Sequence, residues 1–240
     1  MEQEIANRWE KKKNHIETLA NNLRKLRLNL TKDLNSENEK DKLTALVISI
    51  MDKTGERVGN QNSAENGHYG ITGLKKKHIK INGNTITLKY TGKSGVEQEK
   101  SFTDAKIAEA LKSIKNNSND VFVTSNGFKI SNDRVNRYLS EFNITAKDIR
   151  GYSANNWIIK KLEAKDLPKE EKDRKKTFSE TLKSIAEKIG HGKGTLKKHY
   201  LIPELEINYI ENANIINLSN KDSYEAGGAI NNFNYEIGGL

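Results

Sequence analysis

The sequence predicts a mainly helical α+β fold that contains one small three-stranded antiparallel sheet. Apolar residues recur at helical spacing over much of the chain, beginning with residues 1–34. A clear β pattern, in which apolar and polar residues alternate, occurs in residues 79–102. The 240 residues include only two prolines, so long uninterrupted helices are expected.

Each helix is predicted from apolar residues three, four or seven positions apart. The first carries Ile5, Trp9, Ile16 and a run of leucines, and a polar break at residues 35–39 follows it. The second buries Leu43 and the apolar residues that follow. Further helices are expected over residues 103–115 and 131–142, after the capping segment 145–152, and up to Gly190.

Two turns divide the alternating segment into three strands. Asn82-Gly83-Asn84 is a tight turn, and Ile86, Leu88 and Tyr90 alternate after it. The second turn, residues 91–95, places Lys93 at the tip of a hairpin, before a less regular third strand. Such a lysine either reaches into a groove, as a proton donor or phosphate contact, or serves only solubility.

Charge and composition narrow the function classes. With 41 Lys and Arg against 32 Asp and Glu, the net charge is +9, which favours a polyanionic partner, above all nucleic acid. An anionic membrane surface is the competing partner, but no Trp/Phe-rich amphipathic anchor is evident. The chain has no cysteine, which excludes disulfides, thiolate zinc sites and cysteine nucleophiles. Without a signal peptide or an apolar span, the protein is expected to be soluble and intracellular, in the cytoplasm, the nucleoid or a viral factory.

The segment from Gly190 to Tyr200 carries the strongest chemical signal. A tyrosine needs help to act as a nucleophile, because its phenol is protonated near neutral pH. Tyr200 follows His191 by nine positions and has lysines around it, a setting that favours phenolate and holds phosphate. The alternative is a glycine-terminated helix followed by a basic surface segment with an incidental tyrosine.

Two arginines lie where a phosphate could bind. Arg57 follows an apolar helix and is flanked by glycines, so its guanidinium could grip two phosphate oxygens; the alternative is a surface arginine in a turn. Arg150 is expected at a helix N-terminus, where a cation is unfavourable unless an anion binds there.

The order of these residues along the chain resembles the catalytic set of type IB DNA topoisomerases and the related tyrosine recombinases. Asp52-Lys53-Thr54 through Arg57-Val58-Gly59-Asn60 is similar to the first-arginine motif of the topoisomerases. Residues 69–79 are similar to the loop that leads into their hairpin, and Gly92-Lys93 falls where that hairpin carries the catalytic lysine. Lys147-Asp148-Ile149-Arg150 matches Lys-x-x-Arg, where recombinases typically have His-x-x-Arg. His191 with Tyr200 is shared by both branches.

The resemblance implies a helical catalytic core of the topoisomerase IB and recombinase type, and a reaction. Tyr200 would attack a DNA phosphodiester to give a 3′-phosphotyrosyl link, Lys93 would protonate the leaving 5′-oxygen, and Arg57, Arg150 and His191 would stabilise the charge. Religation would need no ATP, and neither a metal nor a nucleotide cofactor is expected. The protein would then relax supercoiled double-stranded DNA as a monomer. Expected DNA contacts, from charge and position, are Tyr69, Lys75, Lys77, Arg134 and Lys147.

The resemblance also suggests domain boundaries and leaves alternatives. Residues 1–40 are expected to form an N-terminal helix and linker, 41–207 the catalytic domain, and 208–240 an Asn/Gly-rich tail. Short viral and bacterial members carry a β-rich N-terminal domain that closes over DNA, and none is expected before residue 43, so either that domain is missing here or DNA is clamped in another way. Residues 192–194 predict a flexible linker before Tyr200. The alternatives are a tyrosine recombinase or integrase, and a DNA-binding module with decayed catalysis.

Overall fold

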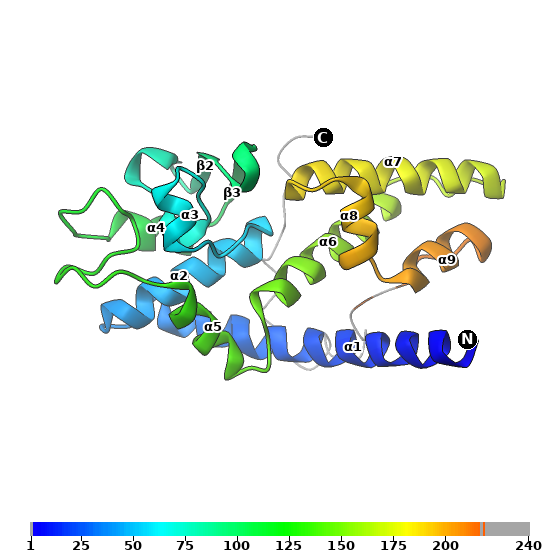
Figure 1. Ribbon diagram of the computed structural model, residues 1–240, viewed down its shortest axis with the longest axis horizontal. Coiled ribbons are helices and arrows are strands. Elements are labelled where there is room, and N and C mark those ends of the chain that lie inside the picture. The colour runs from blue at the N-terminus through cyan, green and yellow to red at the C-terminus, as the bar shows by residue number, and fades with distance from the viewer. Residues whose placement is uncertain (1, 217, 219–240) are drawn as a thin grey trace. The chain divides into compact units, whose positions relative to one another are not determined.

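The computed structural model describes residues 2–216 and 218, with side chains from Thr18 onward (Figure 1). Among these residues the chain forms two compact units. We call the unit from Leu23 to Ile149 the central unit, and the unit formed by residues up to Asn22 and from Arg150 onward the C-terminal unit. The boundary at Asn22 falls within α1 (Glu2–Asp33), the predicted first helix.

The central unit contains the predicted sheet, an antiparallel meander in the order β1-β2-β3. Asn82 pairs with Thr85 across a tight turn, in which Gly83 has a left-handed φ of 59°. Ile86, Leu88 and Tyr90 are buried, and the residues between them are more exposed, as the alternation predicts. The strands are β1 (Ile79–Asn82), β2 (Thr85–Thr91) and β3 (Glu97–Thr103).

The helix α2 (Glu39–Thr54) is the buried helix of the central unit. Asn38 begins it by accepting a hydrogen bond from the Lys40 amide, and Gly55 ends it at a φ of 66°. Every residue from 43 to 52 is buried, not only the one side that the sequence predicts, because α4, α5 and β3 all pack against it. The other elements of this unit are α3 (Gln61–Glu65), η1 (Ile71–Gly73), η2 (Lys76–His78), η3 (Lys93–Gly95), α4 (Ala105–Lys112) and α5 (Asn132–Ser140).

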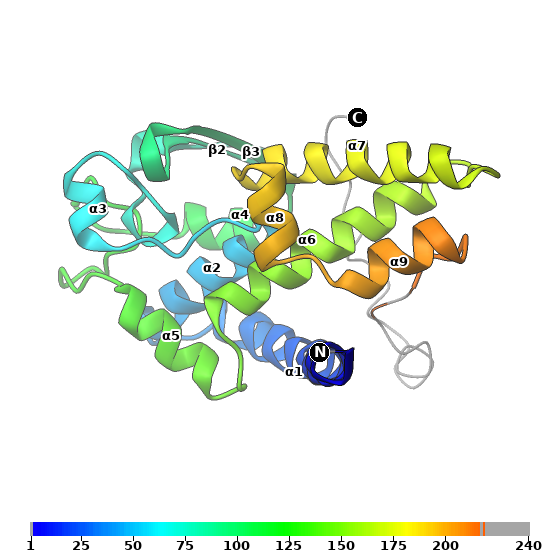
Figure 2. The ribbon, with the colours of Figure 1, turned by 45° about the vertical axis from the view of Figure 1, so that its right-hand side comes forward.

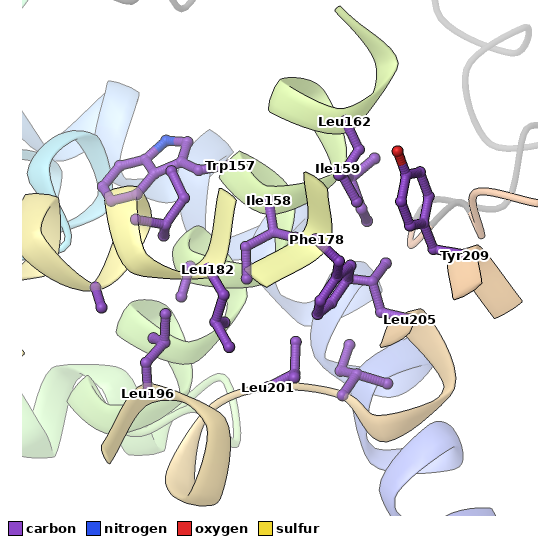
Figure 3. Packing of buried hydrophobic residues seen from close by; sticks show 14 of the residues in the cluster. Trp157, Ile158, Ile159, Leu162, Phe178, Leu182, Leu196, Leu201, Leu205 and Tyr209 are labelled. Carbon is purple, nitrogen blue, oxygen red and sulfur yellow. The ribbon is translucent and has the colours of Figure 1, made fainter. Parts of the chain in front are cut away.

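The C-terminal unit is built from helices around one apolar cluster (Figures 2 and 3). Trp157 and Leu162 come from α6, Phe178 and Leu182 from α7, and all are buried. Leu196 and Leu205 enter the same cluster from later in the chain. The helices are α6 (Ala146–Glu163, of which the residues from Arg150 belong to this unit), α7 (Glu171–Ile189), α8 (Lys193–His199) and α9 (Pro203–Glu211).

Three segments of the C-terminal unit differ from the sequence expectation. The expected flexible linker before Tyr200 is the helix α8, because Leu196 is fully buried and anchors it. Residues 165–176 are dense in charges of both signs, a pattern typical of a mobile or solvated connection, yet they include the start of α7, and Arg174 among them is buried. The apolar core continues past residue 208, since Tyr209 and Ile210 of α9 are buried. Of the expected tail, residues 217 and 219–240 lie outside the described residues.

Candidate active site

A close backbone crossing in the central unit positions Arg57. The Arg57 carbonyl accepts a hydrogen bond of 2.9 Å from the Ile71 amide, beside the point where Gly59 and Gly70 meet. A Cβ atom on Gly70 would lie 2.4 Å from the Gly59 Cα, and Gly59 has a φ of 87°. Only glycine allows this approach, so the two glycines fix the Arg57 segment against the loop that begins at Tyr69. The Arg57 side chain is half-buried.

The same loop connects Arg57 with the hairpin that carries Lys93. The Tyr69 amide donates a 2.8 Å hydrogen bond to the carbonyl of Thr91, the last residue of β2. Lys93 follows two residues later in η3, with an exposed side chain, so its predicted place at the hairpin tip is confirmed. Arg57, Tyr69 and Lys93 thus lie on three segments joined by backbone hydrogen bonds.

A buried histidine supports the Tyr69 ring. The rings of Tyr69 and His78 meet edge to face, with 4.5 Å between their centroids. The Nδ1 atom of His78 accepts a hydrogen bond of 3.1 Å from the Lys75 amide. Burial, and then the positive charges of Lys77 and Lys75, lower the pKa of His78 below its usual value of 6.5. A neutral His78 is therefore part of the folded state near neutral pH.

In the C-terminal unit, Arg150 lies one turn inside α6 and not at its N-terminus. Thr145 and Asp148 exchange side-chain-to-amide hydrogen bonds, as in a capping box, and so start the helix at Ala146. The Arg150 side chain is buried and donates to the carbonyl of Ile189, the last residue of α7. Arg150 is therefore directed at the turn that leads to His191. Its expected place at the helix N-terminus is wrong, so the helix dipole gives no reason for an anion to bind there.

His191 and Tyr200 lie together in the C-terminal unit. Gly190 ends α7 at a φ of 73°, and the His191 amide donates 2.8 Å to the Ala186 carbonyl, which fixes the chain as it leaves the helix. The rings of His191 and Tyr200 are 5.3 Å apart between centroids, at an interplanar angle of 37°. A Cβ atom on Gly151, next to Arg150, would lie 3.5 Å from the Tyr200 ring. Arg150, His191 and Tyr200 are thus grouped in one unit.

Asn155 holds the backbone at Tyr200, and sequence reasoning missed it. Its side-chain amide donates to the carbonyls of Gly151 at 2.7 Å and Tyr200 at 2.8 Å. Its side-chain oxygen accepts 2.9 Å from the Ile202 amide. Asn155 is only 3% exposed, so the segment around Tyr200 is bonded to a buried group of α6. A polar residue between apolar helical positions was the available signal.

A model of the family described as eukaryotic DNA topoisomerase I, catalytic core, matches residues 4–214 of this chain. The chain belongs to this family. It is 28% identical over 179 residues to DNA topoisomerase 1B of Acanthamoeba polyphaga mimivirus, covering 68% of this chain and 53% of that protein. It is 27% identical over 170 residues to DNA topoisomerase I of Monkeypox virus, covering 67% of this chain and 51% of that protein. The chain spans about half the length of these curated relatives.

Solved structures of a site-specific recombinase have a similar fold. The XerH recombinase bound to its difH substrate in a pre-cleavage complex matches with a TM-score of 0.50 and 16% identity, over 80% of this chain and 52% of that one. The post-cleavage complex on a palindromic difH substrate matches with a TM-score of 0.51, over 80% of this chain and 49% of that one. The expected fold of the topoisomerase and recombinase type is therefore confirmed.

Of the side chains expected to contact DNA, some are bonded to other residues of the protein and others are exposed to solvent. Lys75 is hydrogen bonded to Asp120, and Arg134 donates 2.6 Å to Asp41 and 2.9 Å to Thr44. Burial raises the pKa of the Asp120 carboxyl, but the hydrogen bonds from Lys75 and Lys129 outweigh it and hold that pKa below its usual value. Lys77 and Lys147 are exposed.

Two lysines near Tyr200, Lys193 and Lys197, are also engaged. Lys197 pairs with Glu206 at 2.7 Å, and Lys193 donates to the Ser179 hydroxyl.

Among the residues that the structure describes, no group of three or more His, Asp or Glu side chains is arranged to hold a metal ion. None of the described helices is both long and apolar enough to cross a bilayer.

Proposed function

We propose that this chain is the catalytic part of a type IB DNA topoisomerase that relaxes supercoiled double-stranded DNA. The observation that carries the proposal is the placement of Tyr200 beside His191, on a segment bonded to Asn155 of α6, in a chain of the topoisomerase I catalytic-core family. Tyr200 attacks a phosphodiester and forms a 3′-phosphotyrosyl link, and the freed 5′-hydroxyl later reverses the step without ATP.

The other four predicted residues supply charge and a proton to the same phosphodiester. Attack builds negative charge on the non-bridging oxygens, which Arg57, Arg150 and His191 stabilise by hydrogen bonds. Lys93 protonates the leaving 5′-oxygen, and its exposed place at the hairpin tip supports this role. These four cations and donors act where other phosphoryl-transfer enzymes use a metal ion.

Relaxation of supercoiled plasmid in EDTA and without ATP tests the proposal. The wild-type protein should relax the plasmid, and Tyr200→Phe should not. Tyr209→Phe is the matched control, because it makes the same change at a tyrosine buried in the core of the same unit, and it should relax the plasmid. Relaxation by Tyr200→Phe would refute the assigned nucleophile. Arg57→Ala should slow cleavage by about 100-fold or more, as removal of an oxyanion donor does.

A tyrosine recombinase is the second candidate, and its support is the likeness of fold to the XerH complexes. Under this hypothesis the wild-type protein would form a Tyr200-dependent adduct on a short duplex but would not relax plasmid. A DNA-binding module with decayed catalysis would form no adduct at all. We propose double-stranded DNA as the partner and a monomer as the active form, which sedimentation of the protein with and without a short duplex would test.

A further inference from the structure

A buried carboxylate lies directly before Arg57 in the central unit. Glu56 is 4% exposed, and a charged group that far from water is costly unless partners compensate it. Its Oε2 atom accepts a short hydrogen bond of 2.6 Å from the Tyr90 hydroxyl. Its Oε1 atom lies 3.4 Å from the Lys100 ammonium, which makes an ion pair. Both partners come from the sheet, so Glu56 links the Arg57 segment to two strands.

Those two strands lead into and out of the Lys93 loop. Tyr90 is on β2, three residues before Lys93, and Lys100 is on β3, where it pairs with Leu88. A carboxylate that is hydrogen bonded to one strand and ion-paired with the other restricts the pivoting of the hairpin relative to Arg57. The Tyr90 hydroxyl donates to an ionised carboxylate, and such charge-assisted hydrogen bonds are about twice as strong as neutral ones.

The aromatic side chains continue the same link towards Tyr69. The His78 ring lies between Tyr90, at 6.4 Å between centroids, and Tyr69, at 4.5 Å. Backbone hydrogen bonds already hold the ends of these segments, from Ile71 to Arg57 and from Tyr69 to Thr91. Glu56 therefore adds side-chain contacts between segments that backbone hydrogen bonds already join.

We propose that Glu56, through Tyr90 and Lys100, is a positioning residue that holds the Lys93 hairpin in place relative to Arg57. The inference rests on the proposed function, because it concerns proton delivery by Lys93 to the leaving 5′-oxygen. It assigns Glu56 no contact with DNA. Loosening the hairpin should impair leaving-group protonation more than it impairs the charge stabilisation by the arginines.

The test compares two leaving groups in single-turnover cleavage. In one duplex the scissile 5′-oxygen is retained, and in the other it is replaced by sulfur. A thiol has a pKa of about 8.5, so a thiolate leaves without help from a general acid. The variants are Tyr90→Phe and Glu56→Gln. The matched control is Tyr138→Phe, which removes a similar 2.7 Å hydrogen bond to a carboxylate, that of Asp33, elsewhere in the central unit.

We expect Tyr90→Phe and Glu56→Gln to slow cleavage of the oxygen duplex by about 10-fold or more, a part of the 100-fold or greater effect of a general acid. On the sulfur duplex they should cleave within about three-fold of wild type, because no proton is then required. Tyr138→Phe should match wild type on both. Equal slowing on both duplexes, or no slowing, would overturn the inference while wild-type cleavage upholds the proposed function. Absence of any wild-type adduct would overturn both.

Discussion

Replacing Asn155 by alanine should weaken both the fold and the cleavage reaction. The side chain is 3% exposed and bonds the Tyr200 carbonyl at 2.8 Å and the Ile202 amide at 2.9 Å. Alanine leaves both backbone groups without these partners. An unsatisfied buried polar group costs about 1–3 kcal/mol, so Asn155→Ala should lower the free energy of unfolding by about 2–6 kcal/mol. The third bond, to Gly151 of the same helix, adds little, because that carbonyl lies within α6.

The effect on chemistry follows from the same two bonds. They fix the backbone on either side of Leu201, directly after Tyr200, so their loss lets the phenol drift from His191. A misplacement of about 1 Å can cost about 100-fold in rate. Cleavage of a short duplex should therefore slow by about that factor, measured at a temperature where circular dichroism shows the variant folded.

Asn208→Ala is the matched control for this experiment. Asn208 also donates its side-chain amide to a backbone carbonyl, that of Glu204 at 2.8 Å, within α9. Its side-chain oxygen accepts 3.2 Å from the Asn212 side-chain amide. This variant should lose less than about 1 kcal/mol, the net contribution of an ordinary hydrogen bond, and keep the wild-type cleavage rate. If Asn155→Ala unfolds at the wild-type denaturant concentration and forms adduct at the wild-type rate, Asn155 neither stabilises the fold nor positions Tyr200.

Three further predictions concern other parts of the fold. Gly70→Ala should destabilise the protein by more than about 3 kcal/mol in urea unfolding, because its Cβ would lie 2.4 Å from the Gly59 Cα; unchanged stability would contradict the crossing. His78 has a lowered pKa when folded, so its contribution to stability is present above pH 6.5 and is lost as the pH falls through the folded pKa; His78→Gln should flatten that part of the stability curve between about pH 7 and 5. Arg174→Met should lower the free energy of unfolding by about 1–3 kcal/mol, because the buried guanidinium donates 2.7 Å to the Ile210 carbonyl. An unchanged melting temperature would show that this bond does not stabilise the fold.

The parts of the fold that the sequence predicts are those with a local signal. Strict alternation at Ile86, Leu88 and Tyr90 and a glycine turn at Gly83 specify the hairpin, because side chains alternate faces and the turn needs a left-handed residue. Helical spacing likewise finds α2, although it underestimates how much of that helix is buried. In these elements the local pattern and the tertiary packing agree.

The features that the sequence does not predict depend on contacts between distant residues. Arg174 sits in a charge-dense run that is typical of solvent exposure, yet the Ile210 carbonyl, 36 positions later, accepts its hydrogen bond. Gly192 and Gly194 suggest flexibility, but burial of Leu196 stabilises a helix there. The spacing of residues in the sequence reveals neither the hydrogen bond of Arg174 nor the burial of Leu196.

In the candidate site, too, the sequence predicts residues that lie in local motifs but not the contacts between distant residues. The five proposed catalytic residues come from motif order and family resemblance. Their supports, Glu56 and Asn155, are polar residues whose partners on other elements only the structure supplies. Arg150 shows how a local rule can mislead, since the Thr145 cap starts the helix at Ala146 and leaves Arg150 one turn inside it.

Mapping the covalent bond between protein and DNA distinguishes Tyr200 from every other candidate nucleophile. The protein is mixed with a short duplex, the complex is denatured and digested with nuclease and protease, and the modified peptide is sequenced by mass spectrometry. One peptide should carry a 3′-linked nucleotide on Tyr200, present in EDTA and absent from Tyr200→Phe. A nucleotide attached to any other residue, or no modified peptide under conditions where the duplex is bound, would show that Tyr200 is not the nucleophile.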